Sequence, residues 1–296
     1  MSIEKYNFKR KNYKNSDLPY QMGNNEMGGL VDHSGLGFTK LYFSDVWDTD
    51  KSRMSLPGPL MVHQKINEES LSQSEFSNEL TLKEGILTTN VQLPDQSKYS
   101  SEIFFSKSNR HLLCIRLNPD ENFSDGWRLK LPFKGFNINP IQNGLNGTCI
   151  TNDLYSNISW SVGINVQFEH EGDQHVILKP IKGQVIEIFY SVTTQIDGED
   201  YIKQSINNVL QNDDFDKIKE DLVKYSYNEF QQIGSVILPE GEYAKWFYRS
   251  VFALFNTSGA SHFLPAELHF SKPSPDWNGH PFTYGQGGCG IFASTF

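Results

Sequence analysis

Hydrophobic and polar positions alternate with period two over much of residues 20–195, and glycine, asparagine and aspartate residues interrupt the alternation. One run follows a turn at 83–85 and consists of Leu87, Thr89, Val91 and Leu93. A longer run has five alternating apolar positions, Trp160, Val162, Ile164, Val166 and Phe168. Because successive side chains of a strand point to opposite faces, these runs predict strands with one buried face.

The runs also indicate how the strands are connected. The second run reaches Glu171-Gly172-Asp173 and resumes at Val176, which predicts a hairpin, and a further strand is expected over 185–190. Many short strands with turns between them, and no helices in between, are typical of an antiparallel β-sandwich.

After about residue 198 the hydrophobic period becomes helical. Two amphipathic helices are predicted, one from Ile202, Ile206, Val209 and Leu210 and one from Phe215, Ile218, Leu222 and Tyr225. Asp213 or Asp214 is expected to cap the second helix. A third, aromatic helix is predicted over 243–255, with a core-facing side formed by Trp246, Phe247, Val251 and Leu254.

These patterns predict a mainly β chain in three parts. Residues 1–195 form an antiparallel β-sandwich domain, 196–240 form linker helices, and 241–296 begin a helical domain that stays incomplete at Phe296.

Composition narrows the possible partners and compartments. A net charge of −9 and a pI near 5.4 disfavour nucleic acid and anionic membranes. The basic cluster Lys9, Arg10, Lys11 and Lys14 is expected to be a solvated tail. The sequence has no run long enough to predict a membrane span and no signal-peptide core, so the protein is expected in the cytoplasm as written, or outside it if a leader was removed.

Cysteine usage gives no sign of a metal centre. Cys114, Cys149 and Cys289 are odd in number and widely spaced, which predicts neither a disulfide framework nor a zinc site. No cofactor is expected.

The candidate chemistry concentrates at 259–290, where polar side chains and aromatic rings lie together in a loop-rich stretch. Sugars are bound by aromatic faces, with carboxylates, amides and imidazoles taking the hydroxyl groups. We therefore expect a sugar subsite formed by Asp276, Trp277, Asn278, His280 and Tyr284. A packed loop is an equally good interpretation of this segment. Glu267 would suit a general acid if it were buried, although a structural role is more common.

Three other clusters have simpler explanations. The Gly-rich stretch 23–32 has no Lys-Ser/Thr pair of a phosphate loop. Asp45, Asp48 and Asp50 do not have the Gly and Glu of a calcium loop. A hairpin tip accounts for the remaining cluster more simply than a metal site does: Glu169, His170, Glu171, Asp173 and His175.

Three stretches together resemble glycoside hydrolases in which a β-sandwich precedes an (α/α)6 toroid, as in families 95 and 65. They are Met22–Val31 continuing to Leu41–Trp47, Phe76–Leu93, and 235–284. The resemblance implies a fold of sandwich, linker helices and the start of a toroid, and it places the loop that contains Trp277 beside the substrate pocket. Pro281-Phe-Thr-Tyr284 departs from the His and Asn residues usual in family 95, so the substrate is expected to differ.

The resemblance also implies where catalysis would occur. In that family the general acid and the group that activates water lie deeper in the toroid, so we expect the catalytic residues beyond Phe296 and this chain to be inactive alone. The leading hypothesis is the front part of an enzyme that hydrolyses oligosaccharides or glycans. The alternatives are a non-catalytic carbohydrate-binding sandwich and a structural domain whose C-terminal aromatic residues pack on a partner.

Overall fold

The computed structural model describes residues 3–15, 19–24, 26–47, 53–123, 125–150, 157–171, 175–232 and 238–257. In these residues the chain is an antiparallel β-structure followed by helices, as the sequence predicts. Short 3-10 helices lie at η1 (Ile3–Tyr6), η2 (Glu121–Phe123) and η3 (Gln195–Asp197), and α1 (Glu68–Ser72) is a single capped turn between strands.

The largest sheet has nine strands, all paired antiparallel, in the order β1-β7-β8-β9-β10-β17-β14-β13-β12. Its strands are β1 (Phe8–Arg10), β7 (Glu75–Leu80), β8 (Leu87–Gln92), β9 (Lys98–Phe105), β10 (Leu112–Pro119), β12 (Asn137–Ile141), β13 (Gly144–Cys149), β14 (Ile158–Ile164) and β17 (Ile186–Thr194).

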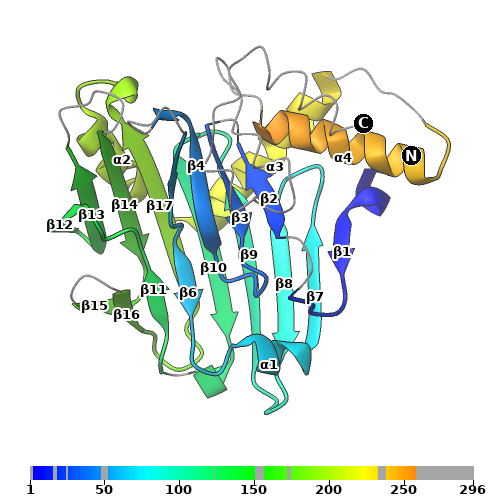
Figure 1. Cartoon of the computed structure of the whole chain (residues 1–296), viewed down its shortest axis with the longest axis horizontal. Coiled ribbons are helices and arrows are strands. Elements are labelled where there is room, and N and C mark those ends of the chain that lie inside the picture. The colour runs from blue at the N-terminus through cyan, green and yellow to red at the C-terminus, as the bar shows by residue number, and fades with distance from the viewer. Residues whose placement is uncertain are drawn as a thin grey trace.

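Two four-stranded sheets form the second layer, in front of the large sheet in Figure 1. One contains β15 (Gln167–Glu171), β16 (His175–Lys179), β11 (Arg128–Lys130) and β6 (Leu60–Val62). The other contains β2 (Tyr20–Gly23), β3 (Met27–Val31), β4 (Phe38–Trp47) and β5 (Arg53–Leu56). They meet where Gly37 bridges to Leu60 and the Met61 amide donates to Leu36 O at 3.0 Å. The two layers complete a sandwich.

Large aromatic side chains fill the space between the layers. Trp127, Trp160 and Tyr190 are fully buried there. Each indole N–H has a backbone acceptor, Phe123 O at 3.1 Å for Trp127 and Pro132 O at 3.2 Å for Trp160. Burial of such side chains is the main stabilising contribution, at about 1.5–3 kcal/mol for each large apolar group.

The alternation over 160–168 does not form one strand. The chain turns at 165–166, so β14 belongs to the nine-stranded sheet and β15 to a four-stranded sheet. Both halves keep the same alternation, and the side chains of Trp160 and Phe168 both reach the core between the layers. The hairpin of β15 and β16 and the strand at β17 are confirmed.

Helices α2 (Tyr201–Leu210) and α3 (Phe215–Gln232) cover the outer face of the large sheet. Both begin where the sequence predicts, and Asp214 caps α3 by accepting a hydrogen bond from the Lys217 amide at 3.0 Å. A second, smaller core lies beneath them and consists of Ile86, Phe104, Leu112, Cys114, Phe189, Val209, Phe215, Ile218 and Leu222. Complete burial there raises the pKa of the Cys114 thiol well above its usual value.

Helix α4 (Glu242–Thr257) packs on the N-terminal segment. Tyr248 stacks on Tyr6 with ring centroids 5.0 Å apart, and the Arg249 guanidinium lies 4.0 Å from the Phe8 ring. The expectation of a solvated basic tail is therefore wrong for Lys9 and Arg10, because β1 pairs with β7 and the Arg10 guanidinium lies 4.2 Å from the Tyr20 ring.

The predicted core-facing side of this helix is also wrong at two positions. Trp246 is 55% exposed and Phe247 36% exposed, whereas Ala244 is fully buried. The side chains of Val251 and Leu254 lie outside the described residues.

Small polar side chains allow α2 to approach the sheet closely. Ser159 and Ser161 of β14 point outward, and the Ser205 hydroxyl of α2 lies 2.7 and 2.9 Å from theirs. Asn146 of β13 donates to the same group of atoms, including Ser161 Oγ at 3.0 Å and Trp160 O at 2.8 Å. Beside them Val209 packs over Gly163, where an added Cβ would lie 3.5 Å from its side chain.

We expect Asn146→Ala to lower the free energy of unfolding by about 1–3 kcal/mol, because it leaves buried hydroxyl and carbonyl groups without a donor. Urea unfolding measures this change. The matched control is Asn139→Ala, since Asn139 lies directly opposite Asn146 on β12 but is exposed, and its change should stay within about 0.5 kcal/mol. Equal effects of the two substitutions would contradict this role of the Asn146 amide.

Candidate functional site

On the outer face of the nine-stranded sheet the type of side chain changes along the strands, from apolar to charged to uncharged polar. At one end Ile86, Phe104 and Cys114 lie buried under α3. The next row across the sheet is Thr88, Glu102 and Arg116, which are paired in register on β8, β9 and β10. Beyond it the following outward positions are uncharged and polar, and no described helix covers them.

The middle row attaches α3 to the sheet. Arg116 forms a bidentate pair with Asp216 at 2.7 and 3.0 Å, and its guanidinium lies 4.0 Å from the Phe215 ring. Glu102 pairs with Lys219. Hydrogen bonding from Arg116 lowers the pKa of Asp216 below its usual range. These ion pairs mark the limit of the helical cover.

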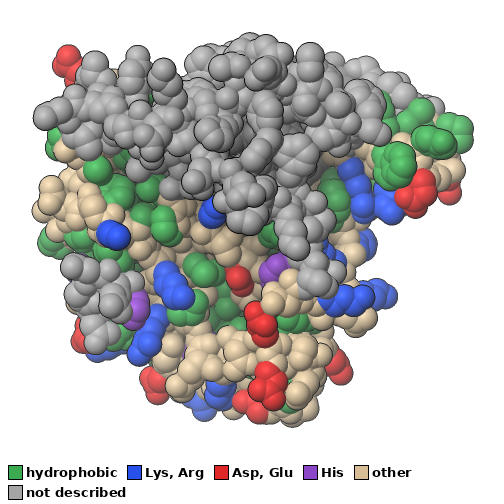
Figure 2. Space-filling model, in the orientation of Figure 1, with side chains coloured by type: hydrophobic (Ala, Val, Ile, Leu, Met, Phe, Trp, Pro, Cys, Tyr) green, Lys and Arg blue, Asp and Glu red, His purple; other side chains and the backbone are tan. Residues whose placement is uncertain are grey.

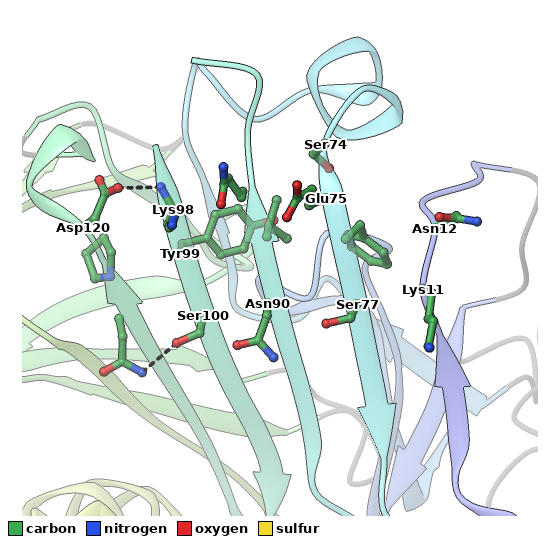
Figure 3. A pocket seen from close by; sticks show the side chains of 15 residues that line it. Lys11, Asn12, Ser74, Glu75, Ser77, Asn90, Lys98, Tyr99, Ser100 and Asp120 are labelled. Carbon is green, nitrogen blue, oxygen red and sulfur yellow. Dashed lines mark hydrogen bonds between the residues drawn. The ribbon is translucent and has the colours of Figure 1, made fainter. Parts of the chain in front are cut away.

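The next row consists of four uncharged side chains, one from each of four neighbouring strands. Ser77 is paired with Asn90, Asn90 with Ser100, and Ser100 with Asn118. We call these four residues the amide–hydroxyl row. Figure 3 shows Ser77, Asn90 and Ser100 side by side on adjacent strands. Their sequence neighbours Phe76, Val91 and Tyr99 point to the opposite face, into the core between the layers, which fixes the orientation of the row.

This row is the floor of an open groove of about 830 Å³. Lys11, Glu75, Lys98 and Asp120 contribute two positive and two negative groups to its lining. Asp120 is held by two backbone amides, those of Lys98 at 2.6 Å and Asn122 at 2.8 Å. The charges of the groove lining therefore balance one another.

The amide–hydroxyl row can bind a neutral polar ligand. An amide both donates and accepts hydrogen bonds, and so does a hydroxyl group. Asn118 Nδ2 lies 3.4 Å from Ser100 Oγ, while Ser77 and Asn90 make no side-chain hydrogen bond within the described part of the chain. Those two side chains retain their hydrogen-bonding capacity for a ligand.

The sugar subsite predicted from the sequence, Asp276, Trp277, Asn278, His280 and Tyr284, lies outside the described residues, and so does Glu267. They stay predictions.

Two members of the His- and Glu-rich hairpin have structural partners. Glu169 forms an ion pair with Lys179, and His170 stacks on Phe133 with ring centroids 5.0 Å apart. In the ranges that the structure describes, no three His, Cys, Asp or Glu side chains gather as metal ligands. Asp173 of this cluster and Asp48 and Asp50 of the acidic run lie outside those ranges.

Sequence reasoning missed the groove. The outward positions Ser77, Asn90 and Ser100 were visible as the polar half of an alternation. Only the register of four strands shows that they form one row, and register is set by pairing that the alternation does not encode.

His63 is the most enclosed histidine of the described chain and has a structural role. Its Nε2 lies 2.6 Å from Asp125 O, and its Nδ1 accepts from the Lys65 amide at 3.1 Å. These two contacts fit only the neutral ring with its proton on Nε2. Phe123 and Trp127 pack against the ring, and this burial lowers the His63 pKa, with the nearby Lys65 adding to the shift and the Asp125 carbonyl and Asp95 opposing it.

Because the folded pKa of His63 is lowered, its neutral form contributes stability above pH 6.5, the usual value for an unfolded histidine. That contribution should decline as the pH falls below 6.5 toward the folded value, by no more than about 1.4 kcal/mol per pH unit. We expect the stability difference between the wild type and His63→Gln to shrink between pH 7.5 and 5.5 in urea titrations. A difference that stays constant over this range would refute the assignment.

Aromatic side chains also gather on the exposed side of α4, at the upper right of Figure 2. They are Tyr243, which is 83% exposed, Trp246 and Phe247. Tyr243 and Trp246 contact each other edge to face with centroids 6.0 Å apart.

Comparison with known proteins identifies the fold. No protein-family model matches the sequence, and no curated protein matches it. Among solved structures, a protein from the human microbiome assigned as a kojibiose phosphorylase has a TM-score of 0.62 and 15% identity over 86% of this chain. This likeness shows a shared fold. The chain spans 42% of that protein's length.

A second structure is more distant. A family GH92 alpha-mannosidase from Bacteroides thetaiotaomicron has a TM-score of 0.47 and 11% identity, with 81% of this chain and 39% of that chain covered. Separately, none of the described helices has the length and apolar character that crossing a bilayer requires.

Proposed function

We propose that the protein is carbohydrate-active and that this chain is the front part of an enzyme that cleaves glycosidic bonds. In this proposal residues 1–195 form the sandwich, 196–240 the linker helices, and 241–296 begin a helical domain. The observation that carries the proposal is the fold shared over 86% of the chain with a protein assigned as a kojibiose phosphorylase.

The described carboxyl groups with a shifted pKa do not suit the role of a general acid. The described carboxyl groups with a shifted pKa are Glu79, Asp95, Asp216 and Glu240, and all four shifts are downward, led by hydrogen bonds from neighbouring side chains. A general acid in glycoside cleavage needs the opposite shift. We therefore propose that none of these four groups is the general acid. From the resemblance to sandwich–toroid glycoside hydrolases we further propose that the catalytic residues lie beyond Phe296 and that the 296-residue chain is inactive alone.

A second candidate is a sandwich that binds glycans without cleaving them. The groove, with balanced charges in its lining and the amide–hydroxyl row at its floor, favours this function. The two candidates differ in one respect: the enzyme requires further sequence for turnover, and the binding module does not.

Turnover assays separate the two candidates. We expect the 296-residue chain to release no sugar or sugar phosphate from an oligosaccharide panel, with or without added phosphate. A protein extended by the gene sequence that follows Phe296 should do so. Cleavage by the isolated chain would contradict its proposed inactivity, and a reading frame that ends at Phe296 would favour the binding module.

We further expect Trp277→Ala to weaken oligosaccharide binding about two- to tenfold, because the indole would present the flat face on which a sugar ring stacks. Isothermal titration with the extended protein measures the effect. Trp277→Phe retains an aromatic face and should preserve most of the affinity. Unchanged binding by Trp277→Ala would remove this residue from the subsite.

A further inference from the structure

We propose that the groove over β7, β8, β9 and β10 is a second, non-catalytic binding site for a neutral glycan chain that lies across the strands. The inference rests on the proposed carbohydrate function but not on residues 276–284. It assigns the amide–hydroxyl row, Ser77, Asn90, Ser100 and Asn118, as the contact residues.

The geometry of the row determines the size of the ligand. Four in-register positions on adjacent strands span three inter-strand gaps, or roughly 14 Å. A single sugar ring is shorter than this distance, so only a chain of linked sugars reaches all four side chains. Each hydrogen bond to a neutral group adds little net affinity, and useful binding therefore requires several together.

The charge of the groove determines the kind of chain. All four residues of the row are uncharged, and the two lysines of the lining are balanced by two carboxylates. A polyanionic chain would gain no net attraction here and would place its charges near Glu75. Nucleic acid is disfavoured for the same reason, since its binding depends on a surplus of Lys and Arg.

A peptide fits this surface poorly. Extended peptides usually bind by pairing with the edge of a sheet and inserting side chains into apolar pockets. The row instead lies on the face of the sheet, and at its centre Asn90 and Ser100 are paired with a neighbouring strand on both sides. The apolar lining residues Phe76, Val91 and Tyr99 are buried and face the other layer.

The position of α3 on the outer face of the sheet supports a binding site at the amide–hydroxyl row. Along the same three strands, the outward positions are first apolar and buried beneath α3, then ion-paired to α3, and only then open. The amide–hydroxyl row begins where α3 and its ion pairs end, so a ligand can reach it without displacing any described helix.

Affinity gel electrophoresis of the full 296-residue chain tests the proposal, with a soluble glucan, a soluble mannan and polygalacturonate as probes. We expect retardation by a neutral polysaccharide, none by polygalacturonate, and affinity for neutral oligosaccharides that rises with chain length. Asn90→Ala and Asn90→Asp should each weaken binding about three- to tenfold, because both remove the amide donor at the centre of the row.

Two controls make the result specific. Asn139→Ala removes an exposed asparagine from β12 of the same sheet, outside the groove, and should bind as the wild type does. Unfolding curves of the Asn90 variants should match the wild type, since Asn90 is exposed.

The outcomes separate this site from the proposed function. If the wild type binds a neutral polysaccharide and the Asn90 variants bind equally well, the groove is not the site, while the carbohydrate function stands. If the chain binds none of the probes but the extended protein cleaves oligosaccharides, the groove proposal fails alone. Stronger binding to polygalacturonate than to the neutral chains would overturn the ligand class.

Discussion

The nine-stranded sheet has to bury both of its faces at β14, and the arrangement of the elements around it follows from this requirement. One face packs against two smaller sheets, and all seven residues of β14 are buried. The backbone of β14 is paired with β13 on one side and with β17 on the other, so what can lie on each of its faces depends on its side chains. The outward Ser159, Ser161 and Gly163 are small enough for α2 to settle directly on the sheet.

Polar contacts between α2 and the sheet carry a desolvation cost that apolar contacts do not. Ser159, Ser161 and Ser205 are fully buried, and such groups stabilise the fold only while each has a partner. Asn146 supplies the donors, and its amide reaches both strand hydroxyls and the Trp160 carbonyl. This requirement fixes the position of α2 more narrowly than an apolar interface would, because a helix displaced along the sheet would leave these groups unpaired.

Sequence patterning predicted the sandwich and its helices because each depends on local periodicity. Leu87, Thr89 and Val91 are buried on one side of β8, and α2 and α3 begin where the period changes. Patterning failed where a long-range contact decides the outcome. Residues 160–168 keep one alternation while changing sheets, and Arg10 is held by Tyr20 and by strand pairing that no local signal encodes. The predicted subsite at 276–284 lies outside the described residues, and the groove needed the register of four strands.

The same sheet therefore has outward rows with different roles, and the order of these rows has a physical reason. Apolar contacts hold α3 on the sheet. Ion pairs such as Arg116 with Asp216 form the boundary of this contact, because charged groups at the edge of a buried interface keep access to water. Side chains beyond that boundary do not pack against a described helix, so residue types at these positions can be selected for ligand binding. Ser77, Asn90, Ser100 and Asn118 occupy this position, at which polar residues cost the fold nothing and can be used for binding.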